Sequence, residues 1–163
     1  MNYGKEGSVV EVTNRIVGIA TSKPKKQPKQ LGFVFYRGPS MLDNNDIVVI
    51  GTLDTSNAKT GNMVQVWILN ESVNPLQATK TGQDSTVCGS CPHRHYNNGA
   101  CYVDVSKAPN AIYKAYKNNR YPQYNEAEHK QYLIGRKVRL GAYGDPAAAP
   151  FDIMQYLAQV GLG

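Results

Sequence analysis

The order of strand-like and helix-like segments in the last hundred residues constrains the fold of this chain more than any other feature. A run rich in Val, Ile and Trp at residues 63–69 precedes an amphipathic helical pattern at residues 106–119. An alternating run at residues 137–141 and a helical stripe after Pro150 follow. Strand, helix, strand and helix in this order indicate two parallel strands of an α/β layer. We therefore expect a βαβα unit whose loops open at the carboxyl ends of its strands.

The first seventy residues read as a small mixed or antiparallel sheet. Short runs rich in Val, Ile and aromatic residues are separated by polar or Gly/Pro segments. Five strands are predicted, at residues 9–12, 15–20, 33–36, 47–53 and 63–69. The expected fold class is α+β or α/β, in one domain over residues 1–163. Within it we expect a β-rich part (1–70), a cysteine metal loop (71–105) and an α/β part (106–163).

The size and composition of the chain favour one globular domain that forms its own core. It has 163 residues, of which 41% are hydrophobic, and this length buries enough surface without disulfides. It contains no apolar run near the roughly 18 residues that a membrane helix needs, and its polar start lacks the layout of a secretory signal. We expect a soluble cytoplasmic protein with no membrane partner.

Three cysteines within fourteen residues are the strongest indication of a bound cofactor. Cys88, Cys91 and Cys101 have the spacing C-x2-C and then x9-C, with His93 and His95 between them. Three thiolates and one imidazole are a ligand set for a closed tetrahedral zinc site, and either histidine could be the fourth ligand. The alternative is an iron–sulfur cluster with one iron left free for an external ligand. Thiols that bind no metal are the third interpretation.

One acidic residue stands at a position suited to a ligand. Asp145 follows the strand at residues 137–141 and precedes the helix after Pro150, within Gly-Asp-Pro. A carboxylate there could contact a ligand or cofactor, and it could equally be a turn or capping residue. No Walker loop, dinucleotide glycine motif, G-x-S-x-G elbow or H-E-x-x-H motif is present in the sequence.

The net charge of +6 is concentrated in two segments. Residues 107–139 hold eight basic and two acidic side chains, and residues 23–29 add four lysines. Eight of the eleven tyrosines lie in or beside the larger basic segment. Cations and aromatic rings together are typical of single-stranded nucleic-acid surfaces, although a solvated helix face over half-buried tyrosines would give the same pattern. The predicted nucleic-acid contacts are Lys25, Lys26, Lys114, Lys117, Arg120, Arg136 and Arg139.

Several stretches together resemble a known family. They are residues 35–40, 57–65, 88–94 (Cys-Gly-Ser-Cys-Pro-His-Arg), 101–103 (Cys-Tyr-Val) and 139–146 (Arg-Leu-Gly-Ala-Tyr-Gly-Asp-Pro). Over about residues 33–160 the chain resembles uncharacterised proteins encoded mostly by bacteriophages and prophages. Because members of that family are longer, the resemblance implies a short form, located in the host bacterial cytoplasm.

A fold-level similarity points to a second class of protein. A cysteine loop after one strand, then a helix and a strand ending in Gly-Asp-Pro, is similar to the opening of radical SAM enzymes. Their second strand carries an acidic Gly-rich motif, and their cysteines are usually spaced C-x3-C-x2-C rather than C-x2-C-x9-C. The similarity supports the iron–sulfur alternative by analogy.

The preferred hypothesis is a non-enzymatic phage-type accessory protein. A zinc site would stabilise its cysteine loop, and the basic, tyrosine-rich region would bind nucleic acid or a host machine that processes nucleic acid. One alternative is an iron–sulfur enzyme similar to radical SAM proteins, with Asp145 near the cofactor. The other is an inhibitor of a host defence or polymerase protein that acts by protein contact. The exposed edges of parallel strands also predict self-association or a partner.

Overall fold

The computed structural model describes residues 29–53 and 60–161, which form a mixed α+β fold around one four-stranded sheet. Its strands, in spatial order, are β1 (Gly32–Pro39), β2 (Asp46–Thr52), β3 (Val64–Asn70) and β4 (Val138–Tyr143). The first three are antiparallel neighbours, and β4 pairs with β3 in parallel. Three of the five strands expected in the first seventy residues are present. The other two, at residues 9–12 and 15–20, lie outside the described residues.

The strand count corrects the expected architecture. The described sheet has four strands rather than five, and the fourth comes from the C-terminal part of the chain. The strands expected in a separate small sheet and those expected in the βαβα unit therefore belong to one sheet. The reason is that β3 pairs with β2 on one edge and with β4 on the other. The order β3, helices, β4, helix confirms the predicted parallel unit.

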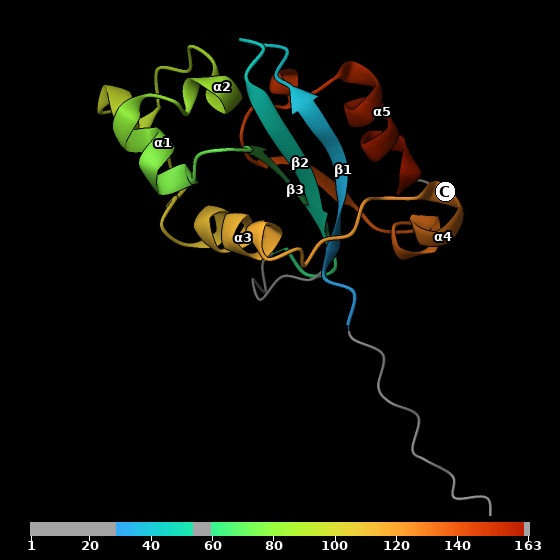
Figure 1. The fold of residues 1–163 in the computed structure, drawn as a ribbon. Coiled ribbons are helices and arrows are strands. Elements are labelled where there is room, and N and C mark those ends of the chain that lie inside the picture. Colours follow the sequence, from blue (N-terminus) through green and yellow to red (C-terminus); the bar gives the residue numbers. More distant parts are fainter. Residues whose placement is uncertain (1–28, 54–59, 162–163) are drawn as a thin grey trace, which may run out of the picture.

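Five α-helices and three short 3₁₀ helices surround the sheet in the described residues (Figure 1). The α-helices are α1 (Pro75–Thr81), α2 (Ser85–Cys88), α3 (Ala108–Lys117), α4 (Glu126–His129) and α5 (Phe151–Val160). The 3₁₀ helices are η1 (His95–Asn97), η2 (Lys130–Tyr132) and η3 (Pro146–Ala148). The helices predicted around residues 106–119 and after Pro150 are confirmed as α3 and α5.

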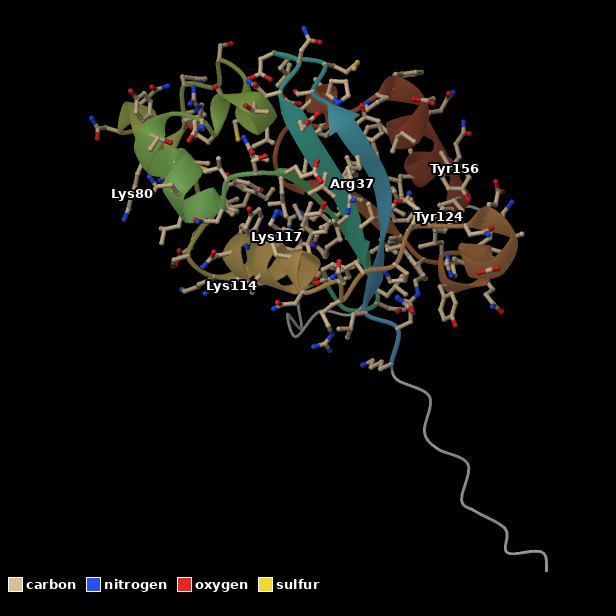
Figure 2. All side chains as sticks on the ribbon, in the orientation of Figure 1. Arg37, Lys80, Lys114, Lys117, Tyr124 and Tyr156 are labelled. Carbon is tan, nitrogen blue, oxygen red and sulfur yellow. The ribbon has the colours of Figure 1, made fainter. Side chains whose placement is uncertain are left out.

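The two faces of the sheet are covered by different elements. Arg37, Val48 and Leu69 are paired across β1, β2 and β3, so they share one face. The Arg37 guanidinium lies 5.2 Å from the centre of the Tyr116 ring on α3, which identifies this face as the one under α3. On the other face Phe35 stacks on Tyr124 at 4.5 Å. The Tyr124 hydroxyl lies 2.6 Å from that of Tyr156 on α5 (Figure 2).

Burial on both faces explains the composition of the middle strands. Six of the seven residues of β2 are buried, and so are six of the seven of β3. A strand covered on both faces has an apolar run rather than alternating polar and apolar residues. The described part of the chain contains no helix that is both long and apolar enough to cross a membrane.

Candidate metal centre

The cysteine segment, residues 82–104, connects α1 to α3 and contains α2 and η1. Cys88 is the last residue of α2, and the Cys91 amide donates a hydrogen bond of 3.2 Å to the Cys88 carbonyl, which closes the C-x2-C turn. The Cys101 amide donates to the His93 carbonyl at 2.9 Å. These two backbone bonds bring the third cysteine back to the turn that holds the first two.

A buried ion pair fixes this turn against α1 and α2. The side chains of Arg94 and Asp84 are 10% and 2% exposed and form a bidentate pair. Arg94 also donates to the carbonyl oxygens of Gly82 at 2.7 Å and Gly89 at 3.2 Å. The hydrogen bonds to Asp84 raise the pKa of the Arg94 guanidinium, so it remains charged. Arg94 thus holds the chain on both sides of Cys88.

All three cysteines line one cavity of about 230 Å³, together with Gly141, Tyr143 and Asp145 among others. The cavity lies where the cysteine segment meets the carboxyl end of β4. The sequence predicted that these two loops would open at the same sheet edge, and the structure brings them together there. In the described ranges no group of three His, Cys, Asp or Glu side chains is close enough to hold one metal ion. The thiols therefore share a cavity and not a single coordination point.

The three thiols differ in their surroundings. Cys88 and Cys101 are half-buried and Cys91 is exposed. Burial, and then the negative charges of Asp84 and Cys101, raise the pKa of the Cys88 thiol to about 12. A thiol with this pKa is protonated at neutral pH, and a bound cation would displace the proton.

Neither histidine lines the cavity of the three cysteines. His93 is exposed, and its carbonyl is used by Cys101. The His95 Nε2 atom lies 2.9 Å from the Val103 carbonyl oxygen, and a ring nitrogen that donates a proton there is not free to bind a metal. His95 instead lines a neighbouring groove that includes Cys101. A fourth ligand from His93 or His95 stays a prediction.

The turn after β4 contributes Asp145 to the cavity and needs glycine to do so. Gly144 has a φ of 84°, and a Cβ there would lie 2.7 Å from the Ile68 carbonyl oxygen. The Asp145 amide donates to the Val87 carbonyl, and its carboxylate accepts a hydrogen bond of 2.9 Å from the Ala147 amide. The capping role weighed from the sequence is therefore present. Asp145 also lines the cavity, so a ligand-contact role is compatible with it.

The predicted basic residues that the structure describes lie on different elements and have different partners. Lys114 and Lys117 are exposed on α3 (Figure 2). Arg120 follows that helix in the chain. Arg136 donates to the Leu53 carbonyl, which follows β2. Arg139 donates to the Tyr102 hydroxyl at 3.0 Å, beside the cysteine cavity. Lys25 and Lys26 lie outside the described residues.

Half of the eight tyrosines in or beside the larger basic segment are buried in the core. Tyr113, Tyr116, Tyr121 and Tyr143 are buried. Tyr102 is 79% exposed and is the most available ring of the cysteine segment. Buried rings cannot stack on bases, so the clustering of tyrosines by itself does not indicate a nucleic-acid surface.

Sequence reasoning missed two residues of this region, because Asp84 and Arg94 carry no metal-ligand or nucleophile pattern. Tyr143, which also lines the cavity, is one of the eight tyrosines in or beside the larger basic segment. An arginine that follows a C-x2-C turn by three residues was the available signal for the ion pair. The chain matches no protein-family model, no curated protein and no solved structure.

Proposed function

We propose that the chain holds an iron–sulfur cluster on Cys88, Cys91 and Cys101 and is an iron–sulfur enzyme distantly similar to radical SAM proteins. The observation that carries the proposal is the cavity in which the three cysteines, and neither histidine, lie beside Asp145. Three protein thiolates leave one coordination position for a ligand that is not part of the protein. We therefore prefer the iron–sulfur cluster to the zinc site, which was the preferred interpretation of the sequence.

The residues present fit such a group in their donor chemistry. Thiolates are the usual ligands of iron–sulfur clusters, and the three thiols share a cavity of about 230 Å³. A single zinc ion needs its ligands within about 2.3 Å of one point, so the sulfurs must converge more closely than around a cluster of several metal atoms. When bound, the cluster would supply one-electron chemistry and an iron open to a ligand.

The position of the cavity also suits a bound substrate or cofactor. Ligands of open α/β sheets bind at the carboxyl ends of parallel strands, and β3 and β4 are the parallel pair here. Asp145 would contact that ligand with its carboxylate, since the Ala147 amide occupies only one of its two oxygens. Arg94 and Asp84 would orient the cysteine turn, and Tyr102, which lines the cavity and accepts a hydrogen bond from Arg139, would contact the same ligand.

Anaerobic reconstitution with iron and sulfide tests the proposal. The expected product is brown, with broad visible absorption and iron and sulfide in about equal amounts. Cys101→Ser should lose this absorption. Ser90→Ala, in the same turn but without a sulfur, is the matched control and should keep it. A colourless wild-type protein that takes up one zinc and no iron would overturn the proposal.

A second candidate function rests on two other observations. His95 and Cys101 line the same groove, and the outer side of α3 carries the exposed residues Lys114 and Lys117. In a zinc-stabilised protein that binds nucleic acid through α3, His95 and Cys101 would be zinc ligands, and Lys114 and Lys117 would contact the phosphates. Binding to a single-stranded oligonucleotide would then weaken steeply with salt and be lost when Lys114, Lys117 and Arg120 are changed to Glu. Undiminished binding by the triple variant would exclude α3 as the contact surface.

A further inference from the structure

A second cavity, of about 410 Å³, shares no lining residue with the cavity of the three cysteines. Nine of its eleven lining residues have polar side chains, and none is basic. They come from the turn between β1 and β2, the carboxyl end of β3 with the loop after it, and residues 81–86. The volume is in the range of small-molecule sites, and the carboxyl end of a parallel strand is where open α/β sheets bind ligands.

Hydrogen bonds between distant segments hold one wall of this polar cavity in place. The Thr86 hydroxyl donates to the Asp43 Oδ2 atom at 2.9 Å, and the Ser40 hydroxyl donates to the Thr86 carbonyl at 2.7 Å. Asn45 donates to Asp43 through its backbone amide at 3.0 Å and its side chain at 2.9 Å. α2 is thereby fixed against the turn between β1 and β2 (Figure 1). A wall that is ordered before binding loses little conformational entropy when a ligand binds.

Asn70, the last residue of β3, carries an unused donor in this cavity. It is 8% exposed, and its Oδ1 atom accepts the amides of Ser72 and Val73, both at 3.1 Å. In the part of the chain that the structure describes, only the Gln65 Nε2 atom and the Tyr143 hydroxyl oxygen are buried without a partner. The Asn70 Nδ2 atom has no acceptor among those residues either, so it is accessible to solvent, and Asn70 lines the cavity.

The cavity offers both acceptors and donors, which narrows the class of ligand. Asp43 and Asp46 line it and supply carboxylates, and Asn70 supplies an N–H donor. A cation cannot accept a hydrogen bond from that donor, and an anion would be repelled by the carboxylates and would find no basic side chain in the lining. A hydroxyl group both donates and accepts, so it satisfies the two kinds of group together.

We propose that this cavity binds a neutral polyhydroxylated ligand, either a saccharide ring or the ribose of a nucleoside. One ligand hydroxyl accepts a hydrogen bond from the Asn70 Nδ2 atom, and ligand hydroxyls donate to the carboxylates of Asp43 and Asp46. The proposal does not rest on the iron–sulfur function, because the two cavities have no lining residue in common.

Titration of the full chain, followed by ¹H–¹⁵N correlation NMR, tests the proposal. The probes are D-glucose, D-galactose and adenosine, and calcium chloride is the competing ligand. At least one of the three hydroxylated probes should shift the side-chain amide signal of Asn70 and the backbone amides of residues 70–73 and 81–86. A shift with the free sugars identifies a saccharide site, and a shift with adenosine alone identifies a nucleoside site. No shift with any of the three, or a shift with calcium alone, would overturn the proposal.

Asn70→Asp tests the donor. The change removes the Nδ2 group but keeps an oxygen for the amides of Ser72 and Val73, so the fold should be retained. The affinity for the probe that binds should fall about tenfold or more. Asn118→Asp is the matched control, because it adds the same charge at an exposed position after α3, outside this cavity, and its affinity should equal that of the wild type. Wild-type affinity of Asn70→Asp would contradict the role of the donor.

Asp46→Asn tests an acceptor and does not depend on the folding of Asn70→Asp. Asp46 is exposed at the start of β2, so the change should leave the melting temperature unaltered. Loss of a hydrogen bond to a charged group should weaken binding of the same probe about tenfold. If Asp46→Asn bound that probe as tightly as the wild type does, the proposed contact between ligand hydroxyl and carboxylate would be wrong.

Discussion

The sheet and the cysteine segment differ in what holds them in place. In β2, Ile47, Val48, Val49 and Ile50 are fully buried, so the sheet is stabilised by many apolar contacts. From residue 89 to residue 104 no side chain is fully buried. That stretch is positioned by backbone hydrogen bonds and by the Arg94–Asp84 pair. A segment held by so few contacts is expected to open locally more easily than the sheet, and a bound cofactor would stabilise it.

The largest expected effect comes from Arg94→Ala. The change leaves the Asp84 carboxylate buried without a partner, which costs about 4 kcal/mol. Hydrogen exchange should show the loss first at the amides of residues 82–104, while those of β2 remain protected. The matched control is the double variant Asp84→Asn with Arg94→Met, which removes both charges and should recover most of the stability. Equal loss of protection in β2 and in the cysteine segment would show that the two regions are not independent.

Ile50→Ala tests the other region. Ile50 is fully buried in the central strand, and its truncation should cost about 3 kcal/mol in the free energy of unfolding, measured with denaturant. Ile134→Ala is the control: this side chain is 52% exposed, and its loss should change stability by about 0.5 kcal/mol or less. The comparison between sheet and cysteine segment would fail if Ile50→Ala destabilised the protein no more than Ile134→Ala does.

Tyr156→Phe should lower the stability of the protein less than Ile50→Ala does. It removes one partner of the 2.6 Å contact between the hydroxyls of Tyr156 and Tyr124, at an expected cost of about 1 kcal/mol in thermal unfolding. The cysteine segment should keep its hydrogen-exchange rates. A change in the exchange of residues 82–104 would reveal coupling between α5 and that segment.

The smallest expected effect separates two roles of Asp145. Asp145→Asn keeps an oxygen for the Ala147 amide, so the stability of the metal-free protein should change by less than about 0.5 kcal/mol. Asp145→Ala should lose about 1 kcal/mol because the acceptor disappears. If the carboxylate contacts a ligand, both variants should lose that contact equally. If Asp145→Asn and Asp145→Ala had the same stability, the capping role of Asp145 would be contradicted.

Local patterns predicted much of the fold. Asn74 followed by Pro75 is typical of a helix start. In the structure Asn74 is the N-cap of α1, and its side-chain oxygen accepts a hydrogen bond from the Gln77 amide. The parallel pairing of β3 with β4 followed from the order of elements, because a crossover through helices returns the chain in the same direction. The strand count was wrong, since nothing in the local pattern says that β4 extends the same sheet as β1, β2 and β3.

The residues that line the candidate site were predictable from the sequence, and their geometry was not. The spacing of Cys88, Cys91 and Cys101 identified the thiols, and the Gly-Asp-Pro turn identified Asp145. Neither pattern shows that the His95 ring contacts the Val103 carbonyl. Nor does either pattern show that His95 lines a different groove from the cavity that all three cysteines line. Histidine spacing within an irregular loop does not fix the direction of the ring, because the backbone there has no regular period.

The sequence by itself determined which segments form strands and helices and where the thiol side chains lie along the chain, because backbone propensity, apolar periodicity and side-chain type are local properties. Only the tertiary structure decided that the three cysteines share a cavity with Asp145, that Arg94 and Asp84 hold their turn, and that the Tyr143 hydroxyl is left without a partner. The physical reason is that burial and hydrogen-bond partners depend on the register of β3 with β4 and on the path of residues 82–104. Both are set by packing between parts of the chain far apart in sequence.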